Sequence, residues 1–217
     1  KLTTFPPLNL TSLERLQLSN CFSLANFPEI LGEMKNLLRL ELDNLPLKEL
    51  PASFQNLVGL EILYLDNCGI CWFPSSIAVM PKLSLVNARS WKGWQWVKSE
   101  EGEEKVGSIV CSNVCDFIVN GCNLYDDFFS TGFMQLDHMI TLSLRNNNFT
   151  FLPECFKELK FLRRLDVSGC FHLQEIRGVP PNLIVFRAIE CISLSSSSSS
   201  MLSNQVLSLF RSDETDM

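Results

Sequence analysis

Apolar residues recur along the chain in one frame: positions 1, 4 and 6 are apolar, and position 9 is in most copies Asn or Cys. First positions are 24, 23 and 23 residues apart from 13 through 37 and 60 to 83, and 23 and 21 residues apart from 139 through 162 to 183. The clear copies begin at Leu13, Leu37, Leu60, Met139 and Leu162, and a weaker copy begins at Leu183. This frame and its period predict a leucine-rich-repeat solenoid. A solenoid favours recognition along a surface over chemistry in a pocket.

Each frame predicts a short strand, because the residues at positions 4 and 6 alternate with polar ones. Two further frames begin at Leu83 and Val114, 31 residues apart, which brings the expected number of parallel strands to about eight. The additional residues of this long step fall in 91–113, where tryptophans are followed by the charged run 98–105. Insertions in repeats form loops on one face, so we expect a long, charged, mobile loop there.

Proline marks the return segment of several repeats, at Pro28, Pro51, Pro74 and Pro153. Proline suits the first turn of a helix. The apolar stretches 30–34, 53–57, 77–80 and 155–159 therefore predict short α or 3-10 helices on the convex side. The predicted fold is a right-handed α/β horseshoe with a parallel sheet on its concave side.

Two parts of the chain differ in composition. Residues 1–194 form the predicted leucine-rich-repeat domain, and 195–217 form a serine-rich linker and a tail. In the tail, the spacing of Leu202, Val206, Leu209 and Phe210 predicts a short amphipathic helix that caps the last repeat.

Five of the nine cysteines fall on position 9 of the frame: Cys21, Cys68, Cys122, Cys170 and Cys191. Asn147 holds the same position in another copy. We expect these side chains to point into the turn after each strand, where a thiol or an amide satisfies backbone groups. Disulfide pairing is the alternative, but adjacent repeats rarely bring sulfurs into bonding geometry. A buried ladder of reduced thiols indicates a reducing compartment.

Charge and hydropathy narrow the possible partners. The net charge of −6 argues against nucleic-acid binding, which needs a basic stripe. No apolar stretch reaches the length of a membrane span. The sequons at Asn9 and Asn148 keep an extracellular alternative open, but the cysteine ladder outweighs them and favours the cytoplasm, with a nucleo-cytoplasmic distribution as a variant.

Signals for catalysis or cofactor binding are weak. His138 and His172 lack a nucleophile or carboxylate at a recognisable spacing. Cys111 and Cys115 fit a zinc spacing, but no second pair follows. Phosphate-binding glycine motifs are absent from the sequence. We expect no enzyme activity, no cofactor, no metal and no small-molecule substrate.

The outward residues of the predicted strands form the candidate binding surface, because the leucines between them point into the core. Eight strands spaced at about 4.8 Å make a surface about 35–40 Å long. Its arginines, tyrosine and aliphatic residues are typical of protein interfaces, although such positions can also be merely solvent-facing. The candidate contact residues are Arg15, Arg39, Glu41, Asp43, Tyr64, Asp66, Arg89, Arg145, Arg164, Asp166 and Arg187.

Several segments extend this interpretation to a family. Residues 21–31, 47–54 and 165–176 resemble repeats of plant intracellular disease-resistance proteins, legume members above all. The subclass has a Toll/interleukin-1-receptor-type domain, a nucleotide-binding ATPase domain and C-terminal leucine-rich repeats. Residues 179–183 and 190–194 resemble its last repeat, so the resemblance covers about 1–205.

The resemblance implies a role in sensing pathogen effectors and in restraining a nucleotide-dependent switch. The implied partner is a protein, either an effector or the receptor's own nucleotide-binding domain. The alternative is a scaffold or adaptor solenoid, such as a truncated product without a switch. A P-loop in the upstream coding sequence supports the first function, and an immediate start codon supports the second.

Overall fold

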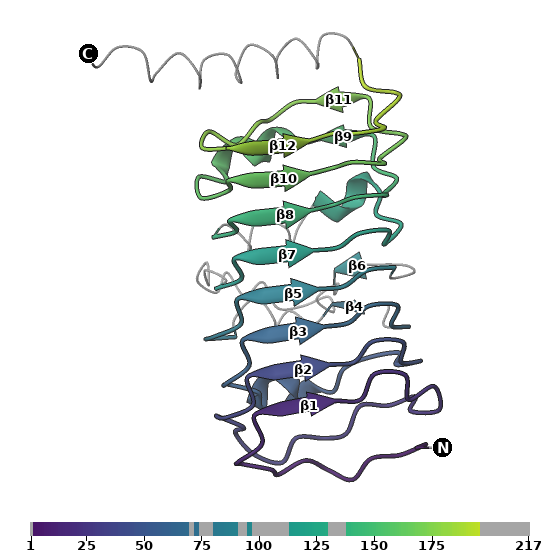
Figure 1. Ribbon diagram of the computed structural model, residues 1–217, viewed down its shortest axis with the longest axis vertical. Coiled ribbons are helices and arrows are strands. Elements are labelled where there is room, and N and C mark those ends of the chain that lie inside the picture. Colours follow the sequence, from purple (N-terminus) through teal and green to yellow (C-terminus); the bar gives the residue numbers. More distant parts are fainter. Residues whose placement is uncertain are drawn as a thin grey trace, which may run out of the picture.

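The computed structural model describes residues 2–69, 72–73, 80–90, 95–96, 113–129 and 138–195. Its strands run side by side in one direction, and the chain returns behind them before the next strand begins (Figure 1). Each turn stacks on the one before it, and the winding is right-handed. The fold class predicted from the repeat frame is confirmed.

The front layer is one eight-stranded parallel sheet in the order β1-β2-β3-β5-β7-β8-β10-β12. Neighbouring strands pair position for position, so that Leu16 lies opposite Leu40 and Leu40 opposite Leu63. The repeat frame thus predicts the register as well as the strands. Their bounds are β1 Arg15–Gln17, β2 Arg39–Glu41, β3 Ile62–Tyr64, β5 Leu85–Asn87, β7 Asp116–Ile118, β8 Thr141–Ser143, β10 Arg164–Asp166 and β12 Val185–Arg187.

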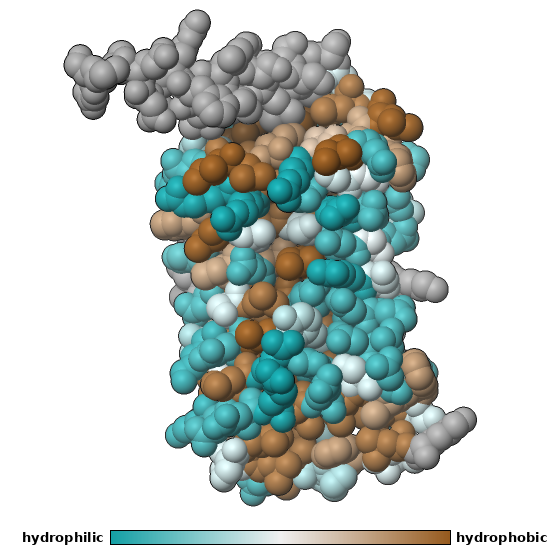
Figure 2. Space-filling model, in the orientation of Figure 1, coloured by the Kyte–Doolittle hydropathy of each residue, from teal (hydrophilic) through white to brown (hydrophobic). Residues whose placement is uncertain are grey.

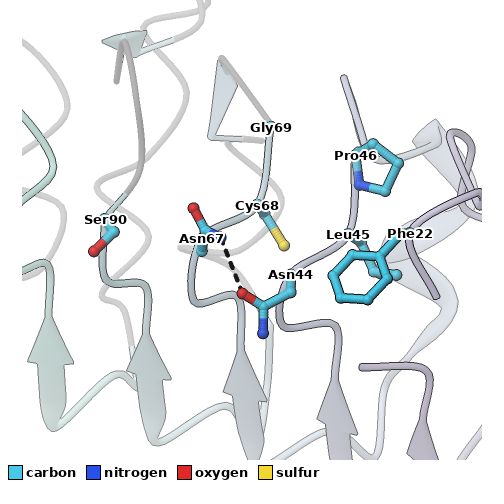
Figure 3. Close-up of a pocket in the computed structure, with 8 residues that line it drawn as sticks. All are labelled: Phe22, Asn44, Leu45, Pro46, Asn67, Cys68, Gly69 and Ser90. Atoms are coloured by element: carbon cyan, nitrogen blue, oxygen red, sulfur yellow. Dashed lines mark hydrogen bonds between the residues drawn. The ribbon is translucent and has the colours of Figure 1, made fainter. Parts of the chain in front are cut away.

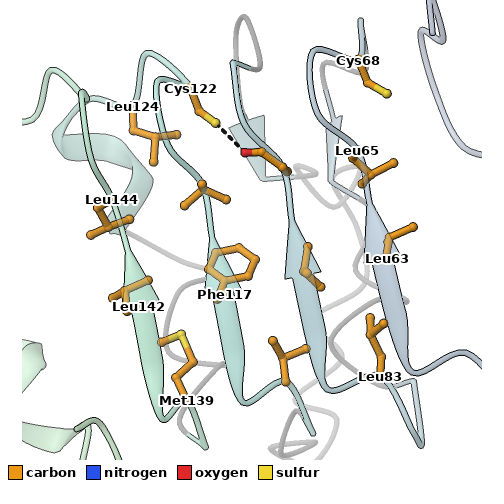
Figure 4. Packing of buried hydrophobic residues seen from close by; sticks show 14 of the residues in the cluster. Leu63, Leu65, Cys68, Leu83, Phe117, Cys122, Leu124, Met139, Leu142 and Leu144 are labelled. Atoms are coloured by element: carbon orange, nitrogen blue, oxygen red, sulfur yellow. Dashed lines mark hydrogen bonds between the residues drawn. The ribbon is translucent and has the colours of Figure 1, made fainter. Parts of the chain in front are cut away.

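The core lies directly behind this sheet and runs the length of the solenoid. Residues at positions 1, 4 and 6 of successive repeats stack in rows, and Leu63, Phe117 and Leu142 belong to the row at position 4 (Figure 4). All three are fully buried. Burying such a side chain stabilises the fold by about 1.5–3 kcal/mol, and each repeat buries it only against its neighbours.

The convex side contains short 3-10 helices and two short strand pairs. Helices η1 (Ala52–Asn56) and η5 (Glu154–Glu158) start directly after Pro51 and Pro153, as the proline tags predict. A third, η3, covers Asp126–Phe129. The strand pairs are β9 (Phe151–Leu152) with β11 (Glu175–Ile176), and β4 (Trp72–Phe73) with β6 (Gln95–Trp96).

The helix expected at residues 30–34 does not form, so that expectation is wrong. Ile30 instead makes a parallel bridge to Leu8, and the amide of Leu31 donates to the Leu8 carbonyl. Pairing with the preceding segment keeps this stretch extended. The stretch 77–80 lies outside the described residues except for Met80.

Strand β6 refines the position of the expected insertion. It pairs in register with β4, 23 residues earlier, so Gln95 and Trp96 occupy the regular return path of their repeat. The extra residues therefore follow Trp96. Residues 91–94 and 97–112 lie outside the described part, as do 196–217. The expected mobile loop, linker and capping helix remain predictions.

Candidate protein-binding surface

The chain turns away from each strand at position 8, where every repeat has a left-handed backbone conformation. Asparagine holds this position in Asn20, Asn44 and Asn67, with φ of 66°, 58° and 53°. Asparagine tolerates this region better than most residues. Their amides form a ladder, in which Asn44 Nδ2 donates to Asn20 Oδ1 at 3.0 Å. The next bond of the ladder runs from Asn67 Nδ2 to Asn44 Oδ1 at 2.9 Å (Figure 3).

Position 9 carries a second ladder behind the first. The Sγ atoms of Cys68, Cys122 and Cys170 donate to the position 6 carbonyl of the preceding repeat at 2.8, 2.9 and 3.2 Å. Asn147 Nδ2 donates to the equivalent Val119 carbonyl at 2.9 Å, and its Oδ1 accepts the Cys122 amide at 3.0 Å. Thiol and amide thus satisfy the same backbone group, as their shared position predicts.

The ladder thiols are free, as expected, but they are not all buried. Cys68, Cys122 and Cys170 are buried, whereas Cys21 and Cys191 are half-buried. Burial of all five was expected, and that expectation is wrong for these two because they lie in the first and last strand-bearing repeats described. Burial raises the pKa of Cys68 and of Cys170 to about 12, so both stay protonated at neutral pH.

A hollow of about 500 Å³ opens beside these two ladders (Figure 3). Phe22, with 72% of its surface exposed, lies at its rim, and Asn44, Asn67 and Cys68 are among the residues that line it. The thiol of Cys68 is protonated, and among the lining residues the hydroxyl of Ser90 has no histidine or carboxylate beside it, so the hollow offers no activated nucleophile.

The outward side chains lie in the three columns that the frame predicts. Pairing in register aligns Arg15 with Arg39, Arg39 with Ile62 and Ile62 with Leu85. The same register continues along the first column through Asp116, Thr141, Arg164 and Val185. The second column, at position 5, runs from Gln17 to Arg187, and the third follows the strands at position 7.

Side chains of the third column serve largely to join neighbouring repeats of the solenoid. Asp43 Oδ1 accepts the backbone N–H of Asp66 at 2.9 Å, and Asp66 Oδ1 accepts that of Arg89 at 2.9 Å. Asn120 Oδ1 accepts the amide of Arg145 at 2.9 Å. Burial raises the pKa of Asp66, and the bond from the Arg89 amide opposes this. Asp43 and Asp66 face outward, but they join repeats together.

Arg39, Glu41 and Tyr64 form one cluster across β2 and β3. Arg39 Nε donates to Glu41 Oε1 at 2.5 Å, and the guanidinium lies over the Tyr64 ring, 4.6 Å from its centroid. The bond to Glu41 is the main cause that raises the pKa of Arg39. Only 9% of the Glu41 surface is exposed. The arginine therefore holds the tyrosine ring in place and is largely satisfied within the chain.

The remaining charged candidates differ in how closely they are paired. Arg89 Nε donates to Asn87 Oδ1 at 3.2 Å and lies 4.0 Å from an Asp66 oxygen. Arg145 lies 4.0 Å from Asp166, whose other oxygen accepts the Ser168 amide. Arg145 follows the end of β8, whereas Arg164 begins β10.

Three arginines keep their guanidinium groups available. Arg15, Arg164 and Arg187 are exposed, and within the described residues none of them forms an ion pair at 4.0 Å or less. Arg15 lies on the first strand of the sheet, and the other two lie on β10 and β12. Charge available to a partner is therefore concentrated near the two ends of the sheet.

The middle of the sheet surface is apolar. Ile62, Tyr64, Leu85 and Ile118 are half-buried on β3, β5 and β7, with Ile62 opposite Leu85 and Asn87 between Tyr64 and Ile118. We call these four residues the apolar centre. Figure 2 shows this face of the molecule, with brown patches among hydrophilic side chains in its middle and towards both ends. Of the four, only Tyr64 was among the candidate contacts; the alternation already placed the aliphatic residues outward.

Groups suited to chemistry are sparse in the described part of the chain. His138 stacks on Phe161 with ring centroids 5.2 Å apart. The residues described contain no group of three or more His, Cys, Asp or Glu side chains arranged to hold a metal ion. Within the same residues, no helix is long and apolar enough to cross a membrane.

Comparison with known protein families identifies the family to which these repeats belong. A family model described as disease resistance protein RPS4B-like, leucine-rich repeats, matches residues 9–208. The chain belongs to this family. The resemblance seen in its repeats is thereby confirmed, and an interaction role for the domain follows from the family.

Three relatives show how much of a resistance protein the chain represents. It is 28% identical to the TMV resistance protein N of Nicotiana glutinosa over 84% of the chain and 20% of that protein. It is 30% identical to the disease resistance-like protein DSC1 of Arabidopsis thaliana over 84% of the chain and 14% of the relative. The disease resistance protein RPS4B of the same plant is 28% identical over 86% of the chain and 15% of its own length. The chain thus spans a fifth or less of each.

A solved structure supports the fold. The leucine-rich repeat domain of the type III effector XopL superposes with a TM-score of 0.65 at 20% identity, covering 84% of this chain and 70% of that one. At this identity the likeness concerns the solenoid alone.

Proposed function

We propose that this domain is the ligand-sensing or autoinhibitory segment of a plant intracellular immune receptor. Its sheet surface binds a protein, either a pathogen effector or the receptor's own nucleotide-binding domain. Membership of the resistance family supports the receptor, and the free thiols fit a reducing cytoplasm.

The observation that carries the proposal is the apolar centre between charged ends. Ile62, Leu85 and Ile118 are half-buried on the same face of the sheet as Tyr64, which Arg39 holds by its cation–π contact. Protein interfaces bury an aromatic or aliphatic anchor at their middle and keep charges at the rim. A ring held before binding loses little side-chain entropy when a partner covers it.

The chain's two tyrosines provide a matched test in the full-length receptor. Tyr64 lies in the apolar centre, whereas Tyr125 is 55% exposed and follows the turn after β7, away from the sheet surface. Each is changed to alanine, and cell death is scored in leaves with and without the effector. Tyr64→Ala is expected to change the response, and Tyr125→Ala to leave it as in the wild type.

The direction of the change identifies the partner. Cell death without effector means that Tyr64 holds the receptor's own switch domain, and loss of the response to effector means that it contacts the effector. Wild-type behaviour of both variants at equal protein levels would overturn the proposal. An upstream coding sequence without a P-loop would favour the scaffold alternative.

A further inference from the structure

Asp116, in the first column on β7, differs from the other acidic side chains of the sheet surface. Among the residues that the structure describes, its carboxylate accepts no hydrogen bond and forms no ion pair within 4.0 Å. Each of the other four outward acids accepts a hydrogen bond from its own chain. The donors are Arg39 Nε for Glu41, the Asp66 amide for Asp43, the Arg89 amide for Asp66 and the Ser168 amide for Asp166. The fold therefore does not use the Asp116 side chain to join its repeats.

The surroundings of Asp116 are largely apolar. Pairing in register places it between Leu85 of β5 and Thr141 of β8. Ile118 faces outward two residues further along the same strand. All four side chains are half-buried. Asp116 thus borders the apolar centre, where its carboxylate gives up part of its hydration without a hydrogen bond from the described chain in return.

Arg164, two strands away in the same column, does not neutralise Asp116. Two strand spacings amount to about 9.6 Å, and Thr141 stands between the two residues. The Arg164 guanidinium is exposed and forms no ion pair with any carboxylate in the described part of the chain. Attraction between charges this far apart in water is weak and is screened by salt. Balancing Arg164 therefore does not explain an acid at this place.

A partner that covers the apolar centre also covers Asp116, and complete burial of a carboxylate is strongly unfavourable unless a positive charge pairs with it. We propose that the partner brings an arginine or lysine side chain among its apolar contact residues and pairs this cation with Asp116. This inference rests on the proposed function and specifies the chemistry of the partner protein. An arginine fits well, because both carboxylate oxygens are open to its two parallel N–H donors and its stem can pack on Leu85.

The unpaired charges of the sheet also determine how the partner lies. Asp116 is on the fifth strand of the sheet, and Arg164 and Arg187 are on the seventh and eighth. A matching partner carries its basic residue within an apolar patch and acidic residues on the side that faces β10 and β12. The reverse orientation would place like charges together, so this pattern selects one orientation of docking.

The test compares substitutions in the full-length receptor, with cell death scored in leaves beside Tyr64→Ala. Asp116→Asn keeps the shape of the side chain and removes its charge, and Asp116→Glu keeps the charge. Glu158→Gln is the matched control, because it removes one negative charge from an exposed residue of the convex helix η5. Asp116→Asn should change the response in the same direction as Tyr64→Ala, and Glu158→Gln should leave it as in the wild type.

Binding by the purified domain provides the second measurement, with the receptor's nucleotide-binding domain and the effector titrated separately. For whichever of the two binds, Asp116→Asn should raise the Kd by about 30-fold or more, because it leaves the partner's cation buried without a counter-charge. Asp116→Glu should bind more tightly than Asp116→Asn. The thermal midpoint of Asp116→Asn should equal that of the wild type, since the carboxylate joins nothing in the described fold.

Three results would overturn the inference, and they differ in what they mean for the proposed function. A wild-type response of Asp116→Asn beside a changed response of Tyr64→Ala means that the surface binds a partner without a cation at this point, and the proposed function stands. Equal losses of affinity in Asp116→Asn and Asp116→Glu mean that side-chain shape matters and charge does not. Wild-type behaviour of both Asp116→Asn and Tyr64→Ala removes the proposed function as well.

Discussion

The turn ladders and the sheet surface lie only a few residues apart in every repeat, yet they use polar side chains in opposite ways. In the ladders, Asn147 and the buried thiols find their partners in the neighbouring repeat. On the sheet surface, Arg164 and Arg187 project without an ion partner among the described residues, and Tyr64 shares its face with half-buried aliphatic residues. Changes in the ladders should therefore affect stability, and changes on the surface should affect binding.

Asp43 and Asp66 show that the outward orientation of a side chain does not decide whether it stabilises the fold or is available to a partner. Both side chains face outward with the sheet surface, but each accepts a backbone amide of the next repeat. Outward orientation is therefore a poor guide to availability in a solenoid, because the ends of its strands are joined through side chains.

The largest effect should come from Asn147, which is 1% exposed and bonds the Cys122, Leu124 and Val119 backbones. Asn147→Ala leaves these buried groups without partners, and we expect a loss of about 3 kcal/mol or more in the free energy of unfolding. Urea denaturation measures it. The neighbouring Asn148→Ala, at a half-buried site, should cost about 1 kcal/mol or less; equal losses would contradict the ladder's role.

Alkaline pH should weaken the ladder next. The pKa of Cys68 and of Cys170 is about 12 in the folded protein and about 9 in an unfolded chain. Because the pKa is raised on folding, each protonated thiol contributes its full stabilisation of the folded state below pH 9. This contribution is lost as the pH rises towards 12. Between pH 9 and 10.5, the free energy of unfolding should fall by about 2 kcal/mol for each of the two thiols.

Urea midpoints at pH 8 and pH 10.5 measure this loss. The Cys68→Ala variant should show a smaller fall between the two pH values than the wild type. An identical fall would assign the alkaline sensitivity to other groups.

A smaller loss of stability is expected at Asp66, which faces outward with the sheet surface but joins two repeats. Asp66→Ala removes the acceptor for the Arg89 amide, at a half-buried site, and should reduce the free energy of unfolding by about 1–2 kcal/mol. Asp66→Asn keeps an acceptor oxygen and should recover most of that loss. Failure of the asparagine variant to recover would mean that the charge, and not the hydrogen bond, stabilises the junction.

The smallest change in stability is expected for the free arginines. Arg164→Ala should shift the free energy of unfolding by about 0.5 kcal/mol or less, because its guanidinium lacks an ion partner in the described residues. The same variant should weaken a partner with an acidic rim, mostly through slower association, which surface plasmon resonance at two salt concentrations would detect. A large stability loss would place Arg164 with the ladders.

The repeat frame predicts most of the fold because its period alone determines which residues meet. Leu16, Leu40 and Leu63 stack as the steps require, and the outward columns follow from the same register. Position 9 was also predictable, because Asn147 and the cysteines share it. The left-handed turn before it was missed, although Asn20, Asn44 and Asn67 recur at position 8 and mark it.

The site was harder to predict, because it depends on where side chains turn. No spacing rule shows that Arg39 lies over Tyr64 or that Asp43 bonds the Asp66 amide, since both contacts arise between repeats. The extended path at residues 30–34 was missed for a similar reason, because its pairing with Leu8 outweighs local helix signals. Alternation placed Ile62, Leu85 and Ile118 outward, but only the structure shows that they are half-buried on the same face as Tyr64.

The most direct test of the division between ladder and surface is one affinity measurement on three proteins: wild type, Tyr64→Ala and Asp66→Ala. Isothermal titration with the effector or nucleotide-binding domain that the leaf assay identifies gives the Kd of each at a temperature where all three are folded. Tyr64→Ala should bind about 10- to 30-fold more weakly, as the loss of a central aromatic contact does, while Asp66→Ala binds as the wild type. Equal binding by Tyr64→Ala and wild type, or a loss confined to Asp66→Ala, would contradict the account.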